Sequence, residues 1–201
     1  SAPDLIALAE RCSAELPCGA TVLQTSAPVL MASPEQHYQH CDGPHLSLMF
    51  ALEQLPPESE QALDFLCHWI NSDKAGGLIA QLRQLHVIDT LRATSLYHFN
   101  GQALLQIEFS AATDIARHAA QIQNTLHDWL AFFSAQQDWP ALRDEYRLLQ
   151  QRQQDVSTAL ELARHYGEQH VPGLSEQGIT ALKAVPVSYT HLRAHETEAD
   201  L

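Results

Sequence analysis

Apolar residues recur in two distinct periods between positions 45 and 167, and these periods predict strands and helices. At 46–53 the residues LSLMFALE form a short apolar run between Gly-Pro and Leu-Pro-Pro, which predicts a buried strand. Residues 56–59, PPES, predict the first turn of a helix that runs to position 70, because proline is tolerated there. The apolar positions of this helix predict one broad face in the core: Ala62, Leu63, Phe65, Leu66, Trp69 and Ile70.

Two glycines, Gly76 and Gly77, separate this helix from the next one. A Gly-Gly pair between helices indicates a hinge or a close approach of two backbones, because glycine has no Cβ. The apolar side of the second helix is predicted to consist of Leu78, Ile79, Leu82 and Leu85.

A β-hairpin is predicted around Asn100-Gly101. Two apolar stretches flank this dipeptide, DTLRATSLYHF at 89–99 and QALLQIEF at 102–109. Asn-Gly between apolar runs is a strong hairpin signal, because both residues tolerate the positive φ that a tight turn requires.

Three further helices are predicted after the hairpin. The first is long and amphipathic, the second spans 138–155 with Asp138 as its cap and Pro140 in its first turn, and the third covers 158–167. The apolar stripe of the first consists of Ile115, Ala119, Ile122, Leu126, Leu130 and Phe133. Adjacent strands followed by helices predict an α+β fold, a mainly antiparallel sheet with helices packed on one face.

Residues 1–44 differ in composition from this region, with an amphipathic start and then many Pro, Ser and Gly residues. We interpret them as a connector from an upstream domain, with one strand at 20–24. The whole chain has a net charge of −13, which argues against binding to a nucleic-acid backbone. It contains no run of 18 apolar residues, so no membrane span or membrane partner is expected.

Two histidine clusters have residue types and spacings that metal sites use. His191 and His195 are four residues apart beside Glu196, which is a spacing that zinc sites use. The surrounding stretch 187–197, VSYTHLRAHET, resembles the conceptual translation of a transposase adapter from sequencing libraries, so 187–201 is interpreted as an artefactual tail. Without it, 186 residues with a net charge of −11 remain, since one Arg, two Glu and one Asp are removed.

The second cluster, HYQHCDGPH, contains His37, His40, Cys41 and His45. His and Cys side chains bind zinc or copper, as does Asp42 between them, but we interpret the cluster as a polar linker that leads into a strand. We assign no metal ligand in this chain.

The segments AGGLIAQLRQLHVIDTLRA, GQALLQIEF, DWLAFF and LRDEYRLL, in this order, resemble the repeating domain of the pitrilysin/insulinase zinc peptidases. Residues 75–91 follow that family's pattern of a PG-x-L-x-x-x-LR/K helix and a small strand. The sequences FNGQALLQIEF and ALELARHY most resemble the branch of this family that serves coenzyme PQQ synthesis. The resemblance covers about 45–167 and implies a LuxS/MPP-like metallohydrolase fold for a truncated domain at 45–186.

The resemblance also implies a function. Family members carry zinc on an H-x-x-E-H motif, which is absent from this chain, so it implies a non-catalytic domain with no catalytic residue and no cofactor of its own. The zinc would belong to the parent metalloendopeptidase, and this domain would help to enclose the substrate. An edge strand of such a domain holds a peptide by strand addition, and the matching positions here are Leu91, Arg92, Ala93, Thr94 and Ser95.

The expected partners are therefore a peptide or protein substrate and the adjoining domains of the same chain. The expected location is the cytoplasm, with the periplasm as the alternative. A second hypothesis is an inactive scaffold or assembly subunit of the same fold, because one fold serves several functions.

Overall fold

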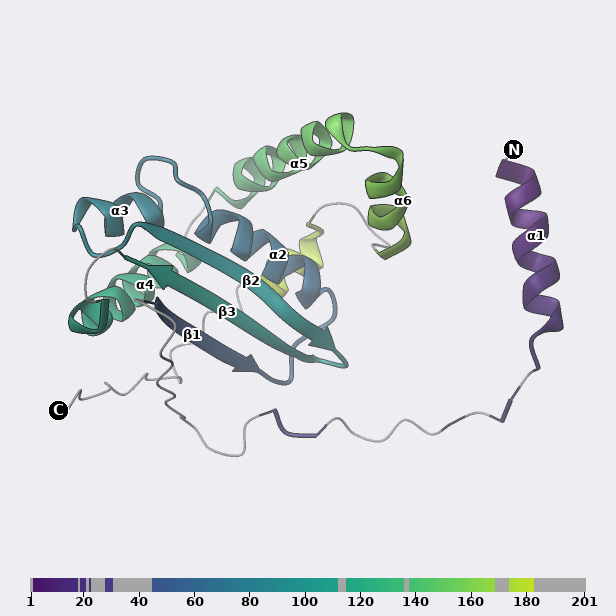
Figure 1. Ribbon diagram of the computed structural model, residues 1–201, viewed down its shortest axis with the longest axis horizontal. Coiled ribbons are helices and arrows are strands. Elements are labelled where there is room, and N and C mark those ends of the chain that lie inside the picture. The colour runs from purple at the N-terminus through teal and green to yellow at the C-terminus, as the bar shows by residue number, and fades with distance from the viewer. Residues whose placement is uncertain are drawn as a thin grey trace.

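The computed structural model describes residues 2–17, 19–20, 22, 28–30, 45–111, 115–135, 138–168 and 174–182. Its first element is helix α1 (Ala2–Glu15), which lies apart from the body of the molecule (Figure 1). The apolar side chains of α1, such as Leu5 and Ile6, are exposed to solvent. The strand predicted at 20–24 falls mostly outside the described residues. His37, His40, Cys41, His191, His195 and Glu196 also lie outside them.

A three-stranded antiparallel sheet forms the centre of the body. Strands β1 (His45–Leu52), β2 (Thr90–Phe99) and β3 (Gln102–Ser110) are arranged in the order β1-β3-β2. The β2–β3 hairpin turns at Asn100 and Gly101, whose φ angles are 50° and 76°, as the Asn-Gly signal predicts. A register shift between Ser95 and Tyr97 marks a bulge in β2.

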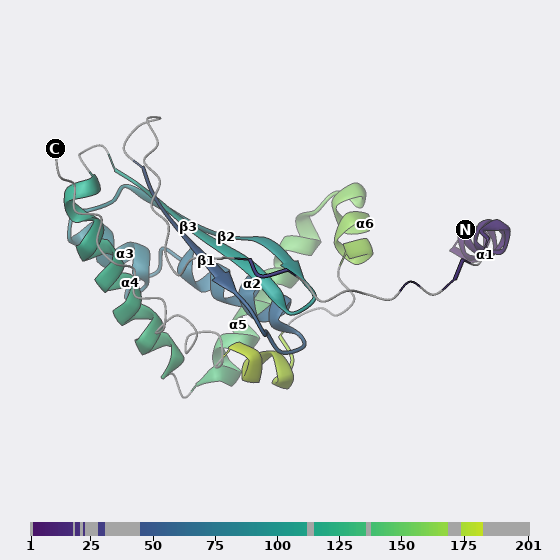
Figure 2. The same ribbon diagram turned by 90° about the horizontal axis from the view of Figure 1, so that it is seen from below.

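Helices cover one face of this sheet, and no helix of the described residues covers the other, which we call the open face (Figures 1 and 2). The covering layer includes α2 (Ser59–Ile70), α3 (Leu78–Gln84) and α4 (Ala119–Ser134), the last preceded by the short 3-10 helix η1 (Ile115–His118). The helices α5 (Trp139–Val156) and α6 (Ala159–Glu168) follow, and a further short helix spans 176–182. The predicted α+β fold with helices on one face is confirmed.

The core lies between the sheet and the helices. Phe65 of α2 is fully buried, and its ring centroid lies 6.0 Å from Trp69, 6.3 Å from Phe133 and 5.1 Å from Tyr146. Edge-to-face aromatic contacts of this kind add to the free energy that burial alone supplies. The cluster therefore joins α2, α4 and α5 into one packed unit.

At the glycine pair the backbone closely approaches the carbonyl groups of preceding residues, which is one of the two interpretations that the sequence allowed. Gly76 has a φ of +84°, and a Cβ on Gly77 would lie 2.9 Å from the carbonyl oxygen of Ser72 and 3.0 Å from that of Lys74. The amide of Gly77 also donates to the Lys74 carbonyl. Glycine is required here because the chain folds back on itself between α2 and α3.

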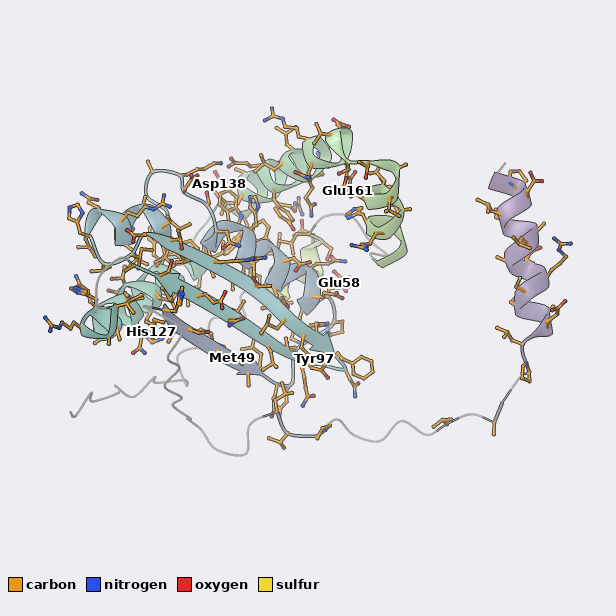
Figure 3. The ribbon with its side chains drawn as sticks, in the orientation of Figure 1. Met49, Glu58, Tyr97, His127, Asp138 and Glu161 are labelled. Carbon is orange, nitrogen blue, oxygen red and sulfur yellow. The ribbon has the colours of Figure 1, made fainter. Side chains whose placement is uncertain are left out.

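Three local predictions were wrong in detail. The run at 46–53 is not a buried strand: β1 alternates, with Met49 53% exposed, because helices cover only one face. Leu85 ends α3 in an exposed position, and Val87 and Ile88 fill the core instead. Asp138 stands at the N-terminus of α5 (Figure 3), but its side chain makes no capping hydrogen bond.

Candidate functional site

The predicted peptide-holding segment, Leu91–Ser95, lies on β2 at an edge of the described sheet. In antiparallel pairing, the N–H and C=O of one residue point to the same side of the strand, and successive residues alternate. Those of Ala93 point away from β3, because both bond to the side chain of Asn71. Leu91, two residues earlier, therefore presents its backbone at the same outer edge.

The side chains of this segment divide between the two faces of the sheet. Leu91 and Ala93 are buried in the core, whereas Arg92 is exposed on the open face opposite Glu108 of β3. Thr94 and Ser95 are half-buried. A peptide at this edge would thus meet backbone groups first, which is how strand addition gains affinity with little demand on sequence.

Helix α2 runs along the outer edge of β2 and faces it with polar side chains. Ala93 N–H donates to Asn71 Oδ1 at 2.7 Å, and Asn71 Nδ2 donates to the Ala93 carbonyl at 2.9 Å. The backbone N–H of Ser95 points to the thiol of Cys67. Farther along, Glu60 Oε2 lies 3.8 Å from His98 Nδ1.

Burial shifts the titration of several groups on α2. The pKa of Asp64 is raised from its usual 3.8 to about 6 by burial and by the nearby charge of Glu60. Burial and the nearby charge of Asp64 raise the pKa of the Cys67 thiol to about 12. The Ser95 amide acts in the opposite direction, because it favours the thiolate. The pKa of His68 is lowered by burial and by Lys74. Cys67 is thus a neutral, unreactive thiol at neutral pH.

The open face of the sheet is polar toward one end and apolar toward the other. Strand alternation places Ser47, Arg92, Gln106 and Glu108 on this face, together with Met49, Leu104, Tyr97 and Phe99 nearer the hairpin. Figure 3 labels Met49 on β1 and Tyr97 on β2. No described helix packs over this mixed surface.

Sequence reasoning placed the edge strand but missed Asn71 and its helix. A signal was present: the polar residues Glu60, Asp64, Cys67 and Asn71 recur at spacings of three and four, which puts them on one side of α2. This stripe borders the broad apolar face of the helix. The contact between this polar stripe and the edge of β2 depends on tertiary packing, so no local sequence pattern predicts it.

The described residues form no cluster that could hold a zinc ion. In the part of the chain that the structure describes, no three His, Cys, Asp or Glu side chains come together as metal ligands. His45, the described member of the HYQHCDGPH cluster, is the exposed first residue of β1. No helix among the described residues is long and apolar enough to cross a membrane.

Comparison with known proteins shows what the chain is similar to. Residues 44–178 match the family described as PQQ synthase PqqF, N-terminal lobe domain 2. Coenzyme PQQ synthesis protein F of Pseudomonas protegens is 50% identical over 182 residues, which are 90% of this chain and 22% of that protein. The protein of the same name from Pseudomonas syringae pv. tomato is 41% identical over 183 residues, covering 91% and 23%.

A solved structure extends the comparison to the fold. The crystal structure of pitrilysin superposes with a TM-score of 0.50 at 13% identity, over 74% of this chain and 17% of that one. At this identity the likeness shows the fold alone. The chain spans between a fifth and a quarter of the length of the two relatives described above.

Proposed function

Because the chain belongs to the PqqF family, as domain 2 of the N-terminal lobe, we propose that it forms part of the substrate-enclosing wall of a zinc-dependent metalloendopeptidase. It acts there as a non-catalytic domain of the PQQ-biosynthesis type. The zinc and its ligands belong to other parts of the parent protein, and no step of this proposal uses a metal held by this chain.

The wall has two parts with different roles. The open face of the sheet supplies a surface of mixed polarity. Within the predicted segment Leu91–Ser95, the outer edge of β2 supplies the backbone groups of Leu91 and Ala93 for an extended peptide. The observation that carries the proposal is the outward orientation of the Ala93 N–H and C=O. Two such groups in one plane are what an added strand requires.

The opposite edge of the sheet supplies a matched control. Ala93 and Ile107 lie opposite each other as a non-hydrogen-bonded pair, because the backbone groups of Ala93 point away from β3. The N–H and C=O of Ile107 therefore point toward Leu48 of β1. By alternation, Ala51 of β1 presents its N–H outward, as Ala93 does on β2. A proline at either position removes one outward N–H and leaves the bonds to β3 in place.

The test is peptide binding by the 201-residue chain, measured by fluorescence anisotropy. The probe is a labelled peptide with a Val-Thr core and lysine flanks, chosen because the chain carries a net charge of −13. We expect Ala93→Pro to weaken binding by about tenfold, because the proline ring at the outer edge keeps a paired backbone from approaching, and Ala51→Pro to leave it unchanged. Equal binding by both variants, or an equal loss, would reject β2 as the site.

The alternative of an inactive scaffold or assembly subunit predicts no such edge-specific binding. If the wild-type chain does not bind the probe, the peptide-holding role fails and the scaffold hypothesis becomes the better one.

A further inference from the structure

Asn71 occupies the position that the backbone of an added strand would take. It follows the last residue of α2, where its own N–H donates to the carbonyl oxygen of Cys67. Its side-chain amide then makes two bonds with Ala93, one to the N–H at 2.7 Å and one from Nδ2 to the C=O at 2.9 Å. A primary amide offers the same donor and acceptor as a peptide group, so Asn71 mimics one residue of a neighbouring strand.

The two ends of this contact differ in how easily they can open. Cys67 is only 8% exposed and packs in the core, so its contact with the Ser95 amide is fixed with the helix. Asn71 is exposed, and its side chain can rotate into water without disturbing the packing of α2. The outer edge is therefore permanently covered at Ser95 and reversibly covered at Ala93.

We propose that the Asn71 side chain is an intramolecular competitor for the peptide backbone at Ala93. A peptide that pairs with β2 must displace this amide, because each of the two Ala93 groups is already engaged. The peptide then extends from Ala93 toward Leu91 and not past Ser95. This inference rests on the proposed function and assigns to Asn71 the role of setting peptide affinity at that site.

Asn71→Ala tests the competition directly. With the amide removed, water satisfies the exposed Ala93 groups, and the peptide no longer displaces two protein hydrogen bonds. We expect the Val-Thr probe to bind about tenfold more tightly, since each net hydrogen bond corresponds to several-fold in affinity. The matched control is Asn124→Ala on the exposed side of α4, which should leave the affinity unchanged.

Hydrogen exchange at the Ala93 amide provides a second readout that a general change in stability would not reproduce. In the free protein this amide should exchange faster in Asn71→Ala than in the wild type, while amides bonded to β3 stay protected. Addition of the probe should restore protection at Ala93 in the variant.

The outcomes separate this inference from the proposed function. Tighter binding by Asn71→Ala, with faster exchange at Ala93 in the free variant, supports the competition. Unchanged or weaker binding by Asn71→Ala, with a wild type that binds, overturns the competition and leaves the peptide site intact. No binding by either protein overturns both.

Discussion

The two faces of the sheet obey different rules. On the covered face, β3 contributes Ala103, Leu105, Ile107 and Phe109, each at most 1% exposed. On the open face, the same strand presents Leu104, Gln106 and Glu108, which are half-buried or exposed. The alternation along a single strand thus assigns one set of residues to folding and leaves the other set free to contact a partner.

This difference explains how the domain can retain its fold while its exposed surface changes. Stability depends on the covered face and its helices, where packing tolerates few changes. The side chains on the open face contribute little to packing, so substitutions there should cost little stability. The predictions below test how strict this division is, and the first has the largest expected effect.

Removal of the central aromatic ring should be the most damaging change. Phe65→Ala empties a fully buried position in contact with Trp69, Phe133 and Tyr146, and we expect a loss of about 3–5 kcal/mol in the free energy of unfolding. Urea unfolding followed by tryptophan fluorescence measures it. Phe99→Ala, at a position 58% exposed on the open face, should cost less than about 1 kcal/mol.

A similar cost for both phenylalanines would contradict the division between the faces. If Phe65→Ala does not fold, Phe65→Leu gives the same comparison at a smaller loss.

Asp64 of α2 is an exception, a half-buried carboxyl group close to the core. Its pKa is about 6 in the folded protein and near 3.8 when unfolded, so its contribution to stability is fully present below pH 3.8 and is lost as pH rises through 6. We expect Asp64→Asn to stabilise the protein by about 2 kcal/mol at pH 7.5, because it removes the buried charge. Thermal unfolding of both proteins between pH 3.5 and 7.5 measures the difference.

The gain in stability from Asp64→Asn should shrink as pH falls and disappear near pH 3.5, where Asp64 in the folded wild type is protonated and as uncharged as the asparagine. An advantage that is constant with pH would show that the charge of Asp64 is not the cause.

Features set by local chemistry were predictable from the sequence, and features set by neighbours were not. Asn100-Gly101 specifies its turn through the φ angles of two residues, so the hairpin was predicted correctly. The apolar run of β1 could not reveal that Met49 is exposed, because burial depends on whether a layer covers that face. Likewise, Leu91–Ser95 could be placed on a strand, but its contact with Asn71 required two segments that are 22 residues apart to meet.

The smallest effect is expected on the open face, at Met49. This residue pairs with Gln106 on β3 and is 53% exposed, so Met49→Thr removes little buried apolar surface and introduces a residue that favours strands. We expect the free energy of unfolding to change by no more than about 0.5 kcal/mol in urea unfolding. Phe50→Thr, one residue along on the covered face, is the matched control. It should lower the free energy of unfolding several times more, because it buries a hydroxyl group in the core. Should Met49→Thr prove as costly as Phe50→Thr, the open face would itself have to be packed against another part of the protein.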